Sequence, residues 1–219
     1  MEGPYVQVPS SLPSNVSADA PIAFLDRDGV INRGKSGYVN GPDEVILLPG
    51  AAHSIGMLNQ EGYLVCVVTN QSPIARELWP AANLGPIHKE LQRQLIEEDP
   101  QAEIHAFLTC PHRFEDACNC RKPSPAMLFL GHQVLREGAV VQSGWEPVNH
   151  AVVEPQVNWW GPKPSPPHPL DLMVGDRRSD MGAGWGFGAR LYRVPAALGL
   201  SFIGDRWADK LDFGDSFQP

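Results

Sequence analysis

The sequence lacks the features that mark membrane-spanning, exported or nucleic-acid-binding proteins. No run of apolar residues approaches the roughly 18 needed to cross a bilayer, and no basic segment followed by an apolar one opens the chain. Basic residues are scarce: 17 Lys and Arg stand against 25 Asp and Glu, for a net charge of −8. This charge argues against duplex nucleic acid or an anionic membrane as the main partner, although a small anion could bind at a local positive site. We expect a soluble cytoplasmic protein, with a monomer favoured.

Glycine and proline, at 21 and 22 residues, are too few for a disordered chain, and a hydrophobic fraction of 42% is enough for a core. At 219 residues the chain suits one α/β domain better than two. Residues 1–20 show no periodicity, so we expect a mobile leader that contributes nothing to the chemistry. Residues 21–219 are then one domain, with an insertion loop at about 137–169 that is rich in proline and tryptophan.

Short apolar runs alternate with amphipathic segments. The runs suit strands buried on both faces of a parallel sheet, and they lie at 22–26, 63–69, 102–108, 170–174 and 190–194. The helical segments lie between Pro49-Gly50 and Gly62, through 84–95 up to Pro100, at 126–135 and near 179–187. This order predicts a doubly wound, Rossmann-like parallel sheet with its site at the carboxyl ends of the strands. The insertion joins a helix end to a strand start, so we expect it to emerge at the opposite, amino edge.

Two carboxylates, Asp26 and Asp28, directly follow the first expected strand, and Gly29 allows the chain to turn away. At alternate positions both can approach one ligand, so that one attacks while the other carries a proton. Asp-x-Asp alone is common and is also typical of a solvated loop. Here three further segments follow at strand ends or in loops: 69–71 (Thr-Asn-Gln), 121–123 (Arg-Lys-Pro) and 175–180 (Gly-Asp-Arg-Arg-Ser-Asp).

The segment 24–32, Phe-Leu-Asp-Arg-Asp-Gly-Val-Ile-Asn, closely resembles the first motif of the haloacid dehalogenase superfamily of phosphotransferases. The other three segments resemble the second, third and fourth motifs of that family, in the same order. The resemblance implies that Asp26 forms an aspartyl-phosphate and that the Asp28 side chain moves the proton. It also implies that Thr69 and Asn70 hold the phosphoryl oxygens and that Lys122 offsets the negative charge.

The resemblance further implies a Mg²⁺ site formed by Asp26, the backbone carbonyl of Asp28, and Asp176. A dianionic phosphate could not approach bare carboxylates, and oxygen ligands are those that Mg²⁺ prefers. Asp180 has two open interpretations, as a partner of the metal ligands or as a cap at a helix start. Only one helix fits between the first two motifs, so we expect no large lid domain, that is, a capless enzyme.

Four soft or borderline ligands, Cys110, His112, Cys118 and Cys120, lie within one short segment. They make a full tetrahedral set for Zn²⁺ with no open position, which is typical of a structural site in a zinc-binding loop. The alternative is a disulfide between two of the cysteines, with a reactive third. Cys66 lies within an expected strand and is interpreted as an inert core residue.

The zinc-type cluster resembles that of heptose bisphosphate phosphatases and of related histidinol-phosphatases, with Arg121 at the phosphate site directly after the last ligand. Pro73 departs from the glycine common there, and proline fixes φ and removes a donor. Arg76 is therefore either a contact for a distal anionic group or an ordinary surface arginine.

The resemblance implies a magnesium-dependent phosphatase that acts on a small-molecule phosphate ester, with a heptose or related sugar bisphosphate as the best guess. The alternatives are a histidinol-phosphate phosphatase, a polynucleotide 3′-phosphatase and, outside enzymes, a zinc-stabilised binding module.

Overall fold

The computed structural model describes residues 3–9, 19–138 and 144–219. The strands are β1 (Tyr5–Val8), β2 (Ile22–Leu25), β3 (Leu64–Asn70), β4 (Ala106–Cys110), β5 (Gly144–Asn149), β6 (Leu172–Gly175) and β7 (Arg190–Arg193). The α-helices are α1 (Ala51–Gln60), α2 (Leu84–Glu98), α3 (Ala126–Leu135) and α4 (Arg178–Phe187). Single turns of 3₁₀ helix lie at Pro42–Glu44, Ala81–Asn83, Phe114–Asp116, Gly199–Ile203 and Arg206–Ala208.

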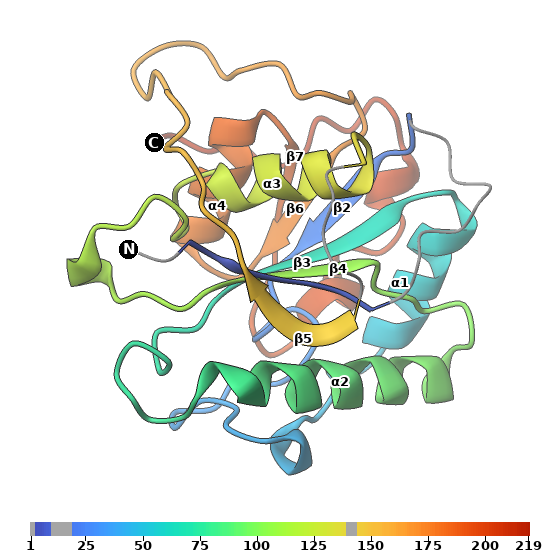
Figure 1. Ribbon diagram of the computed structural model, residues 1–219. Coiled ribbons are helices and arrows are strands. Elements are labelled where there is room, and N and C mark those ends of the chain that lie inside the picture. The colour runs from blue at the N-terminus through green and yellow to red at the C-terminus, as the bar shows by residue number, and fades with distance from the viewer. Residues whose placement is uncertain (1–2, 10–18, 139–143) are drawn as a thin grey trace.

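One sheet, in the order β5-β1-β4-β3-β2-β6-β7, runs through the molecule (Figure 1). The five strands from β4 to β7 are parallel to one another, whereas β1 is antiparallel to both β4 and β5. Helices α1 and α2 cover one face of this sheet, and α3 and α4 cover the other. The expected doubly wound α/β fold is confirmed for the parallel part of the sheet.

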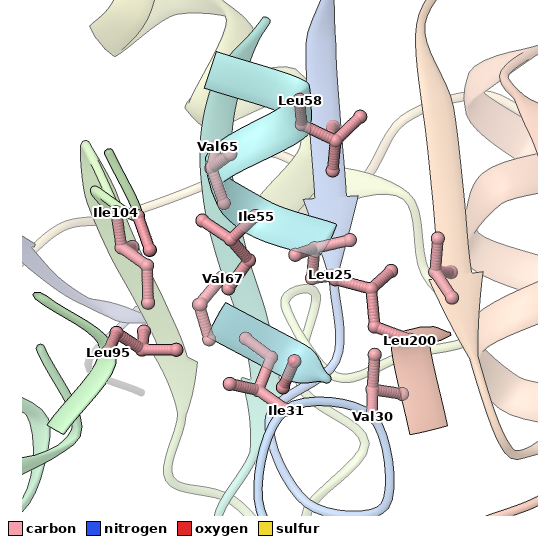
Figure 2. Packing of buried hydrophobic residues seen from close by; sticks show 14 of the residues in the cluster. Leu25, Val30, Ile31, Ile55, Leu58, Val65, Val67, Leu95, Ile104 and Leu200 are labelled. Atoms are coloured by element: carbon pink, nitrogen blue, oxygen red, sulfur yellow. The ribbon is translucent and has the colours of Figure 1, made fainter. Parts of the chain in front are cut away.

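Two apolar layers hold the helices to the sheet. Figure 2 shows the layer beneath α1, where Ile55 and Leu58 of the helix pack against Leu25, Val65 and Val67 of the strands. All five of these side chains are fully buried. The helix is therefore fixed by the 3.6-residue spacing of its apolar side chains, as the sequence predicts.

The strand expected at 102–108 begins at residue 106 instead. Backbone groups before this strand form hydrogen bonds with a side chain of α2: Gln92 Nε2 donates to Ala102 O at 2.9 Å, and Ile104 N donates to Gln92 Oε1 at 2.8 Å. A side-chain amide thus replaces the strand ladder at these residues.

The expectation of a leader at residues 1–20 is wrong for residues 5–8, which form β1 between β4 and β5. Val6 is fully buried, and it pairs with Leu108 on one side and Val148 on the other. Four residues show too little periodicity to predict a strand, and this one is formed by pairing with distant segments. Residues 10–18 lie outside the described residues.

The insertion at 137–169 also departs from expectation. It begins at the amino edge, but β5 carries the chain to the carboxyl edge, since Tyr5 pairs with both Asn149 of β5 and Thr109 of β4. The following segment, orange in Figure 1, returns past α4, where Trp159 stacks on Trp185 at 5.7 Å between ring centroids. The insertion therefore emerges at the amino edge, as expected, but does not remain there.

None of the helices in the described part of the chain is both long and apolar enough to cross a membrane.

Candidate active site

The turn after β2 brings three carboxylates to one edge of the sheet. Asp26 N donates to Val174 O at 3.0 Å, so the pairing with β6 continues one residue beyond the strand. Gly29 then turns the chain with a φ of +84°, and a Cβ atom there would lie only 2.9 Å from Asp176 Oδ2. Glycine is required here both for the backbone conformation and for the space. The turn thus lets Asp26, Asp28 and Asp176 converge.

Lys122 is buried beside the first of these carboxylates. Its Nζ lies 3.0 Å from Asp26 Oδ1 and 2.7 Å from Asp180 Oδ1, and it donates to Val68 O at 2.6 Å. Burial opposes protonation of the amine, but the two carboxylates outweigh it and raise the pKa of Lys122. The lysine is therefore a fixed positive charge next to Asp26.

The oxygen atoms of Asp26, Asp176 and Asp180 lie within 4.8 Å of one another. Burial raises the pKa of Asp26 to about 6, against the lowering effect of Lys122. Burial and the nearby Asp26 likewise raise the pKa of Asp176. Asp176 Oδ1 is buried and has no hydrogen-bond partner among the described residues. A cluster of hard oxygen donors with an unpartnered carboxylate oxygen fits a divalent cation such as Mg²⁺.

The structure supports the helix-cap interpretation of Asp180 and adds a contact with Lys122. Its Oδ2 accepts a hydrogen bond from Arg177 N at 2.9 Å and so caps the start of α4, while Oδ1 faces Lys122. Asp180 is thus an ion-pair partner of Lys122 and a helix cap, and it also belongs to the acidic cluster with Asp26 and Asp176.

Asp28 is held by four donors, two for each carboxylate oxygen. Oδ1 accepts from Arg27 Nε at 3.3 Å and Asn32 Nδ2 at 2.8 Å. Oδ2 accepts from Arg27 Nη2 at 2.9 Å and Gln71 Nε2 at 2.8 Å. Burial alone would favour the neutral acid, but Arg27 and the other donors outweigh it and lower the pKa of Asp28. In this arrangement Asp28 is an ionised carboxylate.

The segment after β3 carries the second motif. Thr69 Oγ1 accepts from Gln71 Nε2 at 3.0 Å. The amide of Asn70 bonds both groups of the Lys122 backbone, because Asn70 Oδ1 accepts from Lys122 N and Asn70 Nδ2 donates to Lys122 O, each at 3.1 Å. Asn70 thus ties the end of β3 to the lysine segment.

A cavity of about 300 Å³ opens over these side chains. Its lining residues include Asp26, Asp28, Thr69, Asn70, Lys122 and Asp180, and they also include Lys35, Tyr38, Phe114, Arg121 and Arg177 from the surrounding loops. A second cavity, of about 600 Å³, shares Asp28, Gly34, Lys35 and Arg177 with the first and also contacts Asp176. The basic loop residues give the site the local positive charge that an anionic ligand needs.

Two arginines that the sequence singles out have different positions. Arg121 lines the first cavity, and its Nη1 donates to His112 O at 2.7 Å. Arg76 is exposed and does not line either described cavity; its Nη1 donates to the hydroxyl of Tyr38 at 3.3 Å. The sequence did not single out Arg27 or Gln71, because their roles follow from contacts with Asp28 that no residue spacing predicts.

The four expected soft ligands form one cluster. Five of the six pairs among the sulfur atoms of Cys110, Cys118 and Cys120 and the Nδ1 of His112 lie 3.3 to 3.6 Å apart. Ligands around a tetrahedral Zn²⁺ are separated by about 3.5 to 3.8 Å, so the cluster fits that ion. All four cysteines of the chain are free, which contradicts the disulfide alternative, and Cys66 is fully buried in β3.

Searches against protein-family models found no match. Among curated proteins, the chain is 42% identical over 106 residues to D-glycero-beta-D-manno-heptose-1,7-bisphosphate 7-phosphatase of Bordetella bronchiseptica, a match that covers 48% of this chain and 58% of that protein. It is 33% identical over 159 residues to D-glycero-alpha-D-manno-heptose-1,7-bisphosphate 7-phosphatase of Mycobacterium tuberculosis H37Rv, covering 72% of this chain and 68% of that protein. The chain thus spans less than two thirds of the first of these relatives.

Solved structures agree in fold. The crystal structure of D,D-heptose 1,7-bisphosphate phosphatase from B. bronchiseptica, complexed with magnesium and phosphate, aligns with a TM-score of 0.61 at 30% identity over 83% of each chain. A HAD-like phosphatase from Mesorhizobium loti aligns with a TM-score of 0.70 at 24% identity, over 98% of this chain and 96% of that one. The second likeness supports the fold alone. With this fold, these motifs and these relatives, the chain belongs to the haloacid dehalogenase-like phosphatase family that contains the heptose-1,7-bisphosphate phosphatases.

Proposed function

We propose that the protein is a magnesium-dependent phosphatase that hydrolyses a small phosphorylated sugar, with a heptose 1,7-bisphosphate as the substrate. The observation that carries the proposal is the position of Asp26, a buried carboxylate that Lys122 contacts at 3.0 Å and that lines a cavity together with basic residues. The names of the curated relatives support the sugar bisphosphate, and they do not favour histidinol phosphate or a polynucleotide. The intact set of acidic and basic residues does not favour a binding module without catalysis.

Asp26 and Asp28 divide the chemistry between them. An Asp26 oxygen attacks phosphorus, the bond from phosphorus to the ester oxygen breaks, and Asp28 gives a proton to the departing alcohol. Water then attacks the aspartyl-phosphate, Asp28 takes a proton from that water, and inorganic phosphate leaves. The ionised Asp28 has the charge state that the second half of this reaction requires, but it must release one of its four donors before it can accept a proton from water. For the first half it must enter as the acid and release at least one of its four donors.

Asp26, the backbone carbonyl of Asp28, and Asp176 are the groups that would hold Mg²⁺. When bound, the ion offsets the charge of the carboxylates and of the phosphate oxygens. Lys122 adds a second positive charge on the side of Asp26 that faces Asp180, and Thr69 and Arg121 line the space for the phosphate. These groups lower the repulsion between an anionic nucleophile and an anionic substrate.

We assign Zn²⁺ to the Cys110, His112, Cys118 and Cys120 cluster, as a structural ion. The cluster begins at the last residue of β4 and ends directly before Arg121, so the ion would fix the segment that leads to Lys122. Thiolate ligation and four free cysteines also support a reducing compartment such as the cytoplasm.

The proposed function is tested by phosphate release in Mg²⁺ from both anomers of heptose 1,7-bisphosphate, other sugar bisphosphates, histidinol phosphate and a 3′-phosphorylated oligonucleotide. We expect a clear preference for a heptose bisphosphate. Asp26→Asn should abolish both turnover and phosphoenzyme formation, because a carboxamide is a poor nucleophile. The matched control is Asp205→Asn, at an exposed carboxylate away from the site, which should keep full activity. Undiminished turnover by Asp26→Asn would contradict the assignment.

A further inference from the structure

A buried row of polar side chains connects the antiparallel edge of the sheet to Asp28. Gln7 of β1 lies between the carbonyl of Trp145 in β5 and the ring of His88 in α2, with Nε2 to O at 2.5 Å and Oε1 to Nδ1 at 2.7 Å. His88 Nε2 lies 3.2 Å from Arg27 Nη1, and Arg27 Nη2 lies 2.9 Å from Asp28 Oδ2. Gln7 and Arg27 are 1% exposed and His88 is 0% exposed.

The donors and acceptors in this row have only one consistent order. Arginine can only donate, so His88 Nε2 accepts from Arg27. His88 must then carry its hydrogen on Nδ1 and donate it to Gln7 Oε1, which leaves Gln7 Nε2 to donate to the Trp145 carbonyl. The neutral ring stacks on Phe107 with a centroid distance of 4.3 Å and an interplanar angle of 12°. Burial and the charge of Arg27 both lower the pKa of His88, which favours the same neutral form.

This row restricts the guanidinium of Arg27. Its Nε and Nη2 bond the two oxygens of Asp28, and Nη1 bonds His88 on the opposite side. Because the guanidinium is planar, a fixed Nη1 also fixes the plane in which Nε and Nη2 meet the carboxylate. Without an acceptor for Nη1, a charged N–H would be buried and unpaired, and the side chain would shift to find another partner.

We propose that His88 and Gln7 are positioning residues that act through Arg27 to orient Asp28 for proton transfer. This inference rests on the proposed phosphatase function and extends it to β1 and α2, neither of which contributes a residue to the cavity over Asp26. Proton transfer depends on the distance and angle between the acid and the departing oxygen, and a displacement of about 1 Å can cost about a hundredfold in rate.

The proposal predicts a dependence on the leaving group. A sugar alcohol is a poor leaving group and needs the proton from Asp28, whereas p-nitrophenolate leaves readily without one. The kcat/KM value reports the steps up to departure of the alcohol or phenolate. Loss of the orienting contacts should therefore lower kcat/KM for heptose 1,7-bisphosphate and leave kcat/KM for p-nitrophenyl phosphate nearly unchanged.

His88→Phe is the first variant, because phenylalanine retains the stacking on Phe107 and removes both hydrogen bonds. We expect kcat/KM in Mg²⁺ to fall about 10- to 100-fold for the heptose bisphosphate and less than about threefold for p-nitrophenyl phosphate. His88→Gln can accept from Arg27 and donate to Gln7, so it should restore most of the difference. Gln7→Leu should also lower the ratio of kcat/KM for the heptose bisphosphate to kcat/KM for p-nitrophenyl phosphate, by a smaller factor.

The matched control is His105→Phe, at a histidine that is also buried and whose Nδ1 accepts from Val65 N at 3.0 Å at the amino edge of the sheet. This variant should lower the melting temperature without changing the ratio between the two substrates. If His88→Phe does not fold, the ratio of the two kcat/KM values measured for Gln7→Leu tests the inference instead.

The inference is wrong if His88→Phe lowers kcat/KM equally for both substrates, or if His88→Gln does not restore kcat/KM for the heptose bisphosphate. The proposed function would still stand in either case, provided that the wild-type protein hydrolyses the heptose bisphosphate. If the wild-type protein hydrolyses neither ester in Mg²⁺, the proposed function is wrong and the inference with it.

Discussion

Ionisation of the buried Asp26 carboxyl group destabilises the folded protein. Its pKa of about 6 in the folded protein lies above the ordinary value of 3.8, so ionisation opposes folding. The stabilising contribution is present below pH 3.8 and is lost as the pH rises through about 6. A buried carboxylate that is ionised at neutral pH is what the proposed nucleophilic role of Asp26 requires, and active sites commonly lower the stability of a fold in this way.

We therefore expect Asp26→Asn to stabilise the metal-free protein at neutral pH. The free energy of unfolding should be similar for the variant and the wild type near pH 4, and the advantage of the variant should grow as the pH rises to about 6.5. Urea unfolding in chelator across this range measures the difference. A difference that does not change with pH would contradict the raised pKa.

The residues that the proposed function places at the phosphate could be named from the sequence, because they lie in four short segments that resemble the motifs of the family. The roles of Arg27 and His88 were not predictable. A histidine within a predicted helix gives no indication of which side chains it contacts. Gln7 reaches His88, and through it Arg27, only because β1 pairs with β4. Such contacts depend on tertiary structure and have no local signal.

At the scale of single elements, the loop between β4 and Lys122 is too irregular to hold its shape by backbone hydrogen bonds alone. Its one helical turn, Phe114–Asp116, ends at Ala117 with a φ of +47°, and four metal-type side chains converge around it. Metal binding to such a loop is coupled to its folding.

Cys118→Ser, or removal of zinc, should therefore loosen the segment that carries Arg121 and Lys122. A displacement of about 1 Å at Lys122 would lower turnover about a hundredfold, although a Zn²⁺ ion held by these four side chains would have no position open to substrate. Metal content and Mg²⁺-dependent kinetics should be measured on the same preparations. Zinc-free protein with full activity, or activity that follows added zinc without magnesium, would contradict this structural role.

The helices were predicted because their apolar residues repeat with the period of a helix, and the parallel strands because they are short apolar runs that suit burial on both faces. The expected helix at 126–135 matches α3 residue for residue, and the expected helix start near 179 lies within one residue of α4. The exceptions, β1 and β5, are short and partly polar, and each requires the other as a neighbour. Their residues contain too little pattern to identify them before pairing.

At the scale of the whole molecule, the insertion is part of the sheet and passes beside the zinc-type loop. Val152 packs in the same apolar cluster as Cys118, and Asn119 Nδ2 donates to the Val152 carbonyl at 3.3 Å. Earlier along the insertion, the Trp145 carbonyl completes the row that ends at Asp28. The insertion therefore contacts both the proposed metal loop and the proposed positioning residues.

Replacing residues 137–169 with a short Gly/Ser linker should consequently impair both stability and turnover. Loss of the β5 ladder and of the Trp159–Trp185 stack should cost roughly 3 kcal/mol or more. Chemical unfolding and heptose bisphosphate turnover measure the two effects. Trp160→Ala is the control, because Trp160 is 98% exposed and its loss should change neither quantity. An active, equally stable linker variant would contradict this account of the insertion.

The pairing of β1 has a consequence for the order in which the chain is completed during synthesis. Tyr5 leaves the ribosome early, but its partners Thr109 and Asn149 follow much later. Until β4 and β5 have been synthesised, the apolar side chains of β1 remain exposed. Pairing across such a long stretch of chain is also slow, because the intervening loop must close first. Asp26 and Asp28 are thus synthesised before either of the strands that pair with β1. The contacts that orient Asp28 are completed only after the chain has passed Trp145.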